Sequence, residues 1–408
     1  MKSRNKLKII NDPIYGFITV PSELIFELIE HRYFQRLRRI SQMGMSYLVY
    51  PGAHHTRFHH ALGAMFLMQK AVRVLRSKNT EISDEEEHAL YIAILLHDIG
   101  HGPFSHAMEH SIVENVSHEH ISLLMMEVLN SEFNGALTLA ITIFKNNYHK
   151  SFLHQLVSGQ LDMDRLDYLK RDSFYTGVSE GSVNAERLIT MLHVKNDKLV
   201  VEEKGIYSVE KFIVARRLMY WQVYLHKTSL VAEQLLVRLL KRAKELSEDG
   251  VVLPASESLS FFLKNHIAKE DFSTEILDTF AKLDDYDIIS AMKAWSTNDD
   301  FVLGELSRML LNRDLLKIKL KNKPISEEKV QQKIEIVANK HNLTVHEATY
   351  FVFSGLIENQ AYNMEIDTIN LITKAGKVVD VAKASDQLNI EALSKKVVKY
   401  YLCYPKAH

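Results

Sequence analysis

The sequence has few of the features that mark secreted, membrane-spanning or polyanion-binding proteins. It contains one cysteine, Cys403, so no disulfide can form within the chain. No apolar run approaches the roughly 20 residues that span a bilayer, and no secretory signal pattern follows MKSRNKLK. The 50 Lys and Arg residues nearly balance the 51 Asp and Glu residues, so no global field attracts nucleic acid or membrane. We therefore expect a cytoplasmic protein without a membrane partner or a nucleic-acid partner.

The chain is rich in apolar residues, and many of them recur at regular spacing. With 46% hydrophobic residues, its 408 residues can bury a large core. Helical spacing predicts helices over 23–42 and 208–248, and alternation predicts hairpins over 7–20 and 191–203. Further alternation predicts strands over 315–321 and 368–384. We predict a mainly α protein with small β hairpins, in which residues 1–250 form the catalytic core and residues 251–408 form an α+β extension packed on it.

Metal-ligating side chains gather in the segment Tyr91–His110, YIAILLHDIGHGPFSHAMEH. Its apolar run ends on His97 and Asp98, and a carboxylate at the end of a buried helix is costly unless a cation or several donors hold it. Glycines and a proline in the next residues break the helix. We therefore expect His101 and His106 on a turn and at a new helix start, facing the same place.

Two other segments supply similar side chains in clusters. Upstream, PGAHHTRFHHALGAMF carries His54, His55, His59 and His60. Downstream, GQLDMDRLDYLKRD carries Asp162, Asp164, Asp167 and Asp172. The spacing of the aspartates does not place Asp164, Asp167 and Asp172 on one helical face, so they cannot all bind one ion. Asp167 is expected to pair with a neighbouring arginine.

The order and the residues of these motifs resemble those of the HD-domain phosphohydrolases, and within that family those of the dGTPase-like deoxynucleoside triphosphate triphosphohydrolases. The motifs are FQRLRRISQMG, YPGAHHTRFHHALG, LLHDIGHGPFSH, SHEH, LDMDRLDYLKRDSFYTG and YLHK. The resemblance runs from about Asn11 to about Lys227. It implies a helical HD core, with its metal-binding part at about 50–180, and hydrolysis of dNTPs to deoxynucleoside and triphosphate by a homo-oligomer, a dimer or tetramer. It also implies one divalent metal ion, which this ligand set does not narrow beyond Mn, Fe, Ni, Zn or Mg, held by His60, His97, Asp98 and Asp164.

The resemblance also implies roles for residues around the metal. The catalytic group is His101, His106, Glu109 and His118. His106 and Glu109 are three residues apart, so on the helix expected after Pro103 they would share a face, and an imidazole supported by a carboxylate can protonate a leaving oxygen. The implied substrate contacts are Gln42, Arg57, Arg165, Tyr168, Asp172, Arg216 and Tyr224.

Some positions depart from the resembled pattern or keep other interpretations open. A regulatory nucleotide pocket is implied near Gln35 and Arg38, although Glu30 stands where some relatives carry Asp. Leu225 replaces a base-reading Gln of several relatives, so base preference does not transfer. The arginines of 32–39 fit a solvated helix face equally well. For His54, His55 and His59 we favour polar loop residues.

Two other functions remain open from the sequence. An HD phosphodiesterase or nucleotidase often adds a histidine pair for a second metal, and His54 with His55 would provide one. A nucleotide-sensing module without hydrolysis would have lost a metal ligand, and all four ligand positions are intact here.

Overall fold

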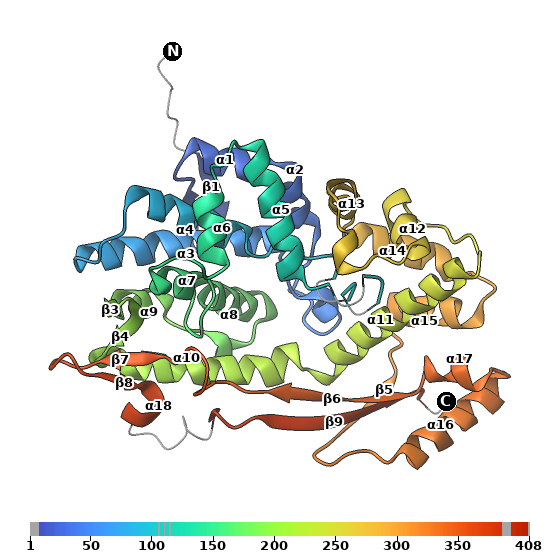
Figure 1. The fold of residues 1–408 in the computed structure, drawn as a ribbon. Coiled ribbons are helices and arrows are strands. Elements are labelled where there is room, and N and C mark those ends of the chain that lie inside the picture. Colours follow the sequence, from blue (N-terminus) through green and yellow to red (C-terminus); the bar gives the residue numbers. More distant parts are fainter. Residues whose placement is uncertain (1–7, 105–106, 110, 114–115, 386–392, 407–408) are drawn as a thin grey trace.

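The computed structural model describes residues 8–104, 107–109, 111–113, 116–385 and 393–406. His106 therefore lies outside the described residues. Among the described residues, helices dominate the fold and strands form three small sheets, which confirms the predicted mainly α class (Figure 1). No helix in the described part of the chain is both long and apolar enough to cross a bilayer.

The first half of the chain is a helical body that follows an N-terminal hairpin. The hairpin pairs β1 (Ile9–Asp12) with β2 (Gly16–Thr19), as predicted. The helices are α1 (Glu23–Glu30), α2 (Arg32–Gln35), α3 (Arg57–Ser77), α4 (Asp84–Leu96), α5 (His118–Glu132), α6 (Thr138–Phe144), α7 (Ser151–Val157), α8 (Met163–Thr176) and α9 (Ala185–Met191), with 3-10 turns η1 (Arg36–Arg39), η2 (Gly44–Leu48) and η3 (Ser179–Gly181).

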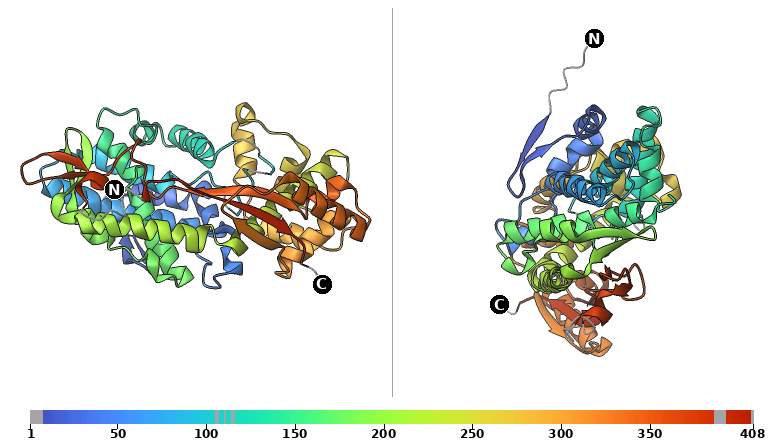
Figure 2. Two further views of the ribbon diagram at one scale, coloured as in Figure 1. Left: turned by 90° about the horizontal axis from the view of Figure 1, so that it is seen from below. Right: turned by 90° about the vertical axis from the view of Figure 1, so that its left-hand side faces the viewer.

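A second hairpin and two long helices follow. The hairpin pairs β3 (Leu192–Lys195) with β4 (Lys198–Glu202), as predicted. The turn η4 (Glu203–Gly205) leads into α10 (Ile206–Met219), the π-helix η5 (Tyr220–Tyr224) and α11 (Lys227–Glu248). In Figures 1 and 2, α10 and α11 lie between the helical body and the C-terminal strands.

The C-terminal part mixes helices and strands. Its elements are α12 (Glu257–Lys264), η6 (Lys269–Asp271), α13 (Thr274–Phe280), α14 (Asp285–Trp295), α15 (Phe301–Leu311), β5 (Lys317–Lys321), α16 (Glu327–His341), α17 (Val345–Thr349), β6 (Phe353–Asn359), β7 (Asn370–Ile372), β8 (Val378–Asp380), α18 (Val381–Ala384) and β9 (Val397–Tyr404). Strand β9 lies between β5 and β6, antiparallel to both. Strand β7 pairs in parallel with β4, so this part completes a sheet begun by the earlier hairpin.

Three predicted elements are interrupted where a side chain or turn redirects the backbone. The predicted helix 23–42 breaks at His31, whose Nδ1 accepts from the backbone of Tyr33 at 3.2 Å and caps a new turn. The predicted helix 208–248 is broken by η5, where the Tyr50 hydroxyl donates to the carbonyl of Gln222. In the predicted strand segment 368–384, Asp380 caps α18 by accepting from the backbone of Ala382 at 2.8 Å, so the last four residues are helical.

Candidate metal centre and substrate cavity

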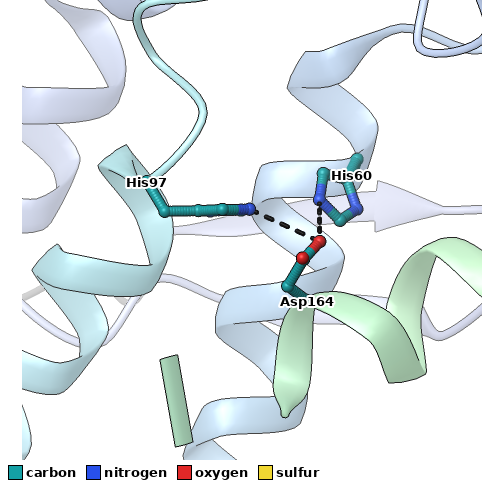
Figure 3. A group of neighbouring side chains, drawn as sticks. All are labelled: His60, His97 and Asp164. Atoms are coloured by element: carbon teal, nitrogen blue, oxygen red, sulfur yellow. Dashed lines mark ion pairs between the residues drawn. The ribbon is translucent and has the colours of Figure 1, made fainter. Parts of the chain in front are cut away.

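Three helix ends bring the candidate metal ligands together, as Figure 3 shows for His60, His97 and Asp164. His60 lies in the first turn of α3, which begins with a capping box of Thr56 and His59. His97 follows directly after α4. Asp164 lies in the first turn of α8, where Asp162 caps the helix by accepting from the backbone of Arg165 at 2.7 Å.

The ligand atoms converge at short distances. Nε2 of His60 is 3.1 Å from Oδ1 of Asp164, and Nε2 of His97 is 3.5 Å from the same oxygen. Asp98 joins the group, with Oδ1 3.5 Å from Nε2 of His97 and Oδ2 3.9 Å from Nε2 of His60. The structure thus gathers the four residues for which the sequence implied a metal.

The two imidazoles are oriented so that their Nε2 atoms can bind a metal. Nδ1 of His60 lies 2.8 Å from a carboxylate oxygen of Asp167, and Nδ1 of His97 lies 2.6 Å from the carbonyl of Ile94. Since a carboxylate and a carbonyl only accept hydrogen bonds, each Nδ1 donates, so that Nε2 is the nitrogen left to bind a metal once it has lost its proton. Both Nε2 atoms are buried without a hydrogen-bond partner in the described part of the chain.

The electrostatics of the group also favour a cation. Burial opposes protonation of His60, yet the carboxylates of Asp164 and Asp167 raise its pKa to about 10. Burial alone would raise the pKa of Asp164, but His60 and His97 hold it well below its usual range. Two imidazole nitrogens beside two carboxylates form a donor set that suits a divalent transition metal or Mg²⁺. The residues therefore fit a divalent cation.

A buried ion-pair network supports His60 from behind. Arg171 donates from Nε and Nη2 to the two oxygens of Asp167 at 2.9 and 3.0 Å, and from Nη1 to Asp12 at 2.8 Å. The predicted pairing of Asp167 with an arginine is present. The contact of Asp167 with His60 was not predicted. Gly63 makes the approach of α8 to α3 possible, because a Cβ there would lie 2.1 Å from Asp167 and 2.2 Å from Arg171.

Asp98 leads to a second group of histidines. Its Oδ2 accepts from Arg57, and its Oδ1 lies 3.4 Å from Nε2 of His101. His101 is buried, and burial together with Arg57 holds its pKa well below the usual range, so its imidazole is neutral. The ring of His118 stacks on His101 with centroids 3.7 Å apart. Glu109 accepts from Nδ1 of His118 at 3.0 Å.

The helix predicted after Pro103 is absent from the described residues. Phe104 adopts a left-handed φ of +50°, and the described residues between it and α5 form turns. The helix instead begins at His118, because Ser117 caps it by accepting from the backbone of His120 at 3.3 Å. Glu109 is therefore placed on a turn, where it supports His118.

A cavity of about 340 Å³ adjoins the metal ligands. Arg57, which contacts Asp98, lies in its wall, and so do four other predicted substrate contacts. These four are Gln42, Tyr168, Asp172 and Tyr224. Arg165 and Arg216 do not line it, although both lie close enough to Tyr168 to lower its pKa while burial raises it. Arg165 instead pairs with Asp162.

Asp172, in the wall of this cavity, is held by two side chains. Its Oδ1 accepts from Nε2 of His55 at 2.6 Å and its Oδ2 accepts from the Tyr224 hydroxyl at 2.8 Å. His55 is buried and stacks on Tyr175 with centroids 4.4 Å apart. His55 lies in the loop before α3, as predicted, but its burial and its role in orienting a carboxylate of the cavity were not foreseen. His59 caps α3, and His54 stacks on Tyr47.

Two other residues that position the site were missed in the sequence. Arg36, grouped above with the arginines of a solvated face, is buried and donates to the carbonyl of His101 at 2.6 Å and of Ile99 at 3.2 Å. Asp285, at the start of α14, accepts from the backbone of Ser41 at 2.8 Å and of Phe104 at 2.7 Å. Asp285 comes from the C-terminal part, where no sequence pattern pointed to the site.

Comparison with known proteins agrees with this geometry. The HD domain model matches residues 57–172, and the model of the HD associated region matches residues 183–253. YwfO of Bacillus subtilis, an uncharacterized protein, is 31% identical over 98% of this chain and 92% of its own length. A phosphohydrolase crystal structure from Bacteroides thetaiotaomicron superposes with a TM-score of 0.95 at 53% identity, over 98% of this chain and all of that one. The chain belongs to the HD-domain phosphohydrolase family.

Within this family, some relatives carry a named activity. The deoxynucleoside triphosphate triphosphohydrolase SAMHD1 homolog of Dictyostelium discoideum is 31% identical over 63% of this HD phosphohydrolase and 55% of its own length. SAMHD1 of Bos taurus is 27% identical over 67% of this chain and 53% of its own length. This HD phosphohydrolase thus spans just over half the length of these two relatives.

Proposed function

We propose that this HD phosphohydrolase cleaves deoxynucleoside triphosphates into deoxynucleoside and inorganic triphosphate with the help of one divalent cation. The observation that carries the proposal is the position of Arg57, which contacts the metal ligand Asp98 and lines the adjoining cavity. A nucleotide in the cavity would thus have its phosphates beside both the cation ligands and a guanidinium. The dNTP triphosphohydrolases named SAMHD1 among its relatives support the same substrate class.

The protein's own residues would bind the phosphates and orient the sugar. When bound, the cation supplies Lewis acidity to a phosphoryl oxygen. Arg57 lines the cavity, and Arg165 and Arg216 lie close to Tyr168 of its wall. These guanidiniums from three segments suit a long polyanion better than a single phosphate, for which one guanidinium fork is enough. Asp172 and Gln42 are the proposed partners of the sugar 3′-hydroxyl. A hydroxyl that reached Asp172 would share a carboxylate already held by His55 and Tyr224.

The base and sugar would lie against aromatic side chains. The rings of Tyr220 and Tyr224 are 5.2 Å apart, those of Tyr168 and Tyr224 are 6.0 Å apart, and all three line the cavity. Such faces stack on any base. Tyr168, with Met43 in the same cavity, is proposed to crowd a 2′-hydroxyl, so that dNTPs are preferred over NTPs.

Two imidazoles compete for the role of general acid at the 5′-oxygen. His106 is the residue that the family resemblance implies, and it lies outside the described residues. His118 has the carboxylate support that this role requires, through its hydrogen bond with Glu109 at 3.0 Å. A general acid typically contributes about 10²–10⁴-fold to the rate. Comparing His106→Ala with His118→Asn at saturating substrate identifies which side chain provides that factor.

A specific observation favours a second candidate function. Asp98, His101 and His118 form another group whose atoms lie close enough to hold an ion, and Oδ1 of Asp98 also lies 3.5 Å from Nε2 of His97 in the first group. Two cations about 4 Å apart characterise many phosphodiesterases and phosphatases. We propose this group as the second site in preference to the pair His54 and His55, because Nε2 of His55 already contacts Asp172. An HD phosphodiesterase or nucleotidase would therefore bind two ions per chain, and the proposed triphosphohydrolase one.

The assembly is proposed to be a cytoplasmic homo-oligomer, a dimer or tetramer, with a regulatory nucleotide bound near Gln35 and Arg38. In the isolated chain Arg38 donates to Gln35 at 2.9 Å and covers the ring of Phe58 at 3.6 Å. Light scattering with and without added nucleotide tests both points. Constant mass, with a hydrolysis rate of one dNTP that does not rise when a second is added, would contradict them.

One experiment tests the reaction itself. The purified protein is incubated with each dNTP and each of Mn, Fe, Ni, Zn and Mg, and the products are separated by anion exchange. The proposed function predicts deoxynucleoside and triphosphate in equal amounts. In ¹⁸O-labelled water, label in the triphosphate indicates attack at the α-phosphorus, and label in the nucleoside indicates attack at carbon. Pyrophosphate or orthophosphate as the primary product would refute the proposal.

A further inference from the structure

A second and larger cavity, of about 680 Å³, lies outside the substrate site. One wall is the face of α11 that carries Arg238 and Lys241, and the second wall comes from α17 and the start of β6. Figure 1 shows α11 running above these C-terminal elements. His346 and Phe353 belong to the second wall, and Glu109 of the turn that precedes α5 reaches the same space.

Arg238 has no acidic partner in the described part of the chain. Its hydrogen bonds there go to Gln234 of its own helix, to the carbonyl at 3.3 Å and to the side chain at 3.0 Å. One face of its guanidinium covers the ring of Phe353 at 3.3 Å. Arg238 is half-buried, and this burial lowers its pKa. An anion that enters the cavity would form charge-assisted hydrogen bonds with this half-buried guanidinium, and these are stronger than hydrogen bonds between neutral groups.

The spacing of the two cations indicates the kind of anion. Arg238 and Lys241 are three residues apart on one helix, so their side chains lie on the same face about 5–6 Å apart at Cβ. A guanidinium fork with a neighbouring ammonium matches two successive phosphates better than one carboxylate. The cavity is also twice the size of the substrate cavity, so a chain of three phosphates fits within it.

A chain of contacts between four side chains connects this cavity to the metal centre. Glu109, in the cavity wall, accepts from Nδ1 of His118 at 3.0 Å. His118 stacks on His101 at 3.7 Å between centroids, and Nε2 of His101 lies 3.4 Å from Oδ1 of Asp98. An anion in the cavity would repel the carboxylate of Glu109. Any shift of Glu109 withdraws support from His118 at the edge of the active site.

We propose that the cavity between α11 and β6 is an inhibitory site for a polyphosphate group, bound by Arg238 and Lys241 and sensed by the active site through Glu109. The ligand is either an inorganic polyphosphate or a nucleoside triphosphate, since both offer the same successive phosphates. Binding of the polyphosphate group does not depend on the proposed dNTP hydrolysis. Only the inhibition of hydrolysis by the bound ligand rests on the proposed function.

The binding test uses calorimetric titration of the metal-loaded full chain with inorganic tripolyphosphate and, separately, with ATP. The test variant is Arg238→Gln with Lys241→Gln. The matched control is Arg73→Gln with Lys211→Gln, which removes the same charge from exposed helix positions outside the cavity. Because the test variant lacks the charge-assisted contacts, the affinity of its cavity site for the probe should fall about 10-fold or more. The affinity of the control variant should stay unchanged. Arg238→Lys, which keeps the charge and loses the fork, should lie between them.

The kinetic test separates this site from simple competition at the active site. With tripolyphosphate present, kcat should fall in the wild-type and control proteins and stay constant in the cavity variant, whereas a competitor at the active site raises KM in all three. An effect of ATP without one of tripolyphosphate identifies a nucleotide as the ligand. Equal affinity of the cavity variant and the control for both probes overturns the proposal, whether or not dNTPs are hydrolysed. Equal thermal unfolding of the variants establishes that the fold is intact.

Discussion

Asp167 offers the sharpest test of how the fold prepares the metal centre. Its carboxylate accepts from Nδ1 of His60 at 2.8 Å and from Arg171 at 2.9 and 3.0 Å, all in the buried interior. In Asp167→Asn an amide replaces the carboxylate, so the charge that polarises His60 is lost and an N–H group faces one of the donors of Arg171. Two measurable losses follow, one in metal affinity and one in stability.

The expected magnitudes come from the partners that remain. Loss of a carboxylate behind a ligating histidine typically weakens metal binding about 10–100-fold, which corresponds to about 1.4–2.7 kcal/mol. Removing one member of a buried ion pair typically costs about 3–5 kcal/mol. Arg171 keeps its contact with Asp12 at 2.8 Å in the variant. We therefore expect Asp167→Asn to lower the free energy of unfolding by about 3 kcal/mol, the lower end of this range.

Metal affinity is measured by competition with a chromophoric chelator, and stability by urea unfolding in the presence of excess chelator. The matched control is Arg171→Lys, which weakens the fork on Asp167 and leaves the contact of Asp167 with His60. It should lose stability with at most a small loss of metal affinity. Wild-type metal affinity in Asp167→Asn, or an equal loss in both variants, would refute the assignment of Asp167 as the support of His60.

Four further predictions address the ligands, the helix packing, the sugar and the pH dependence. The double variant His97→Ala with Asp98→Ala should lose bound metal by elemental analysis and lose hydrolysis while its circular dichroism stays helical; stoichiometric metal in this variant would contradict the ligand set. Gly63→Ala should unfold at lower temperature and bind metal weakly, because its Cβ would lie 2.1 Å from Asp167, and an unchanged melting temperature would show that α3 and α8 adjust freely. The wild-type protein should hydrolyse dATP and dGTP faster than ATP and GTP, and Asp172→Asn should reduce this ratio; equal wild-type rates would remove the sugar assignment. Burial opposes ionisation of Asp167, but Arg171 and His60 lower its pKa below the ordinary value, so its contribution to stability is present above about pH 4 and is lost as the pH falls toward the lowered pKa; urea midpoints from pH 3 to 6 should show this loss in the wild type and less of it in Asp167→Asn.

The sequence by itself determined the class of fold and the candidate metal ligands. Helical periodicity and capping residues are local properties, so α3, α4 and α8 could be located from their own segments. His60, His97, Asp98 and Asp164 could be named because the motifs that contain them resemble those of a known family, and the structure brings them together.

Only the tertiary structure decided which side chains pair with one another. His55 and Asp172 are 117 residues apart, and Ser41 and Asp285 are 244 apart, so no local periodicity relates them. Arg36 has the same local sequence character as its exposed neighbours, and its burial depends on carbonyls supplied by distant turns. Local sequence sets which helices form and where they can begin; the pairing of buried polar groups is set by packing, because a buried donor or charge is stable only where a distant segment offers a partner.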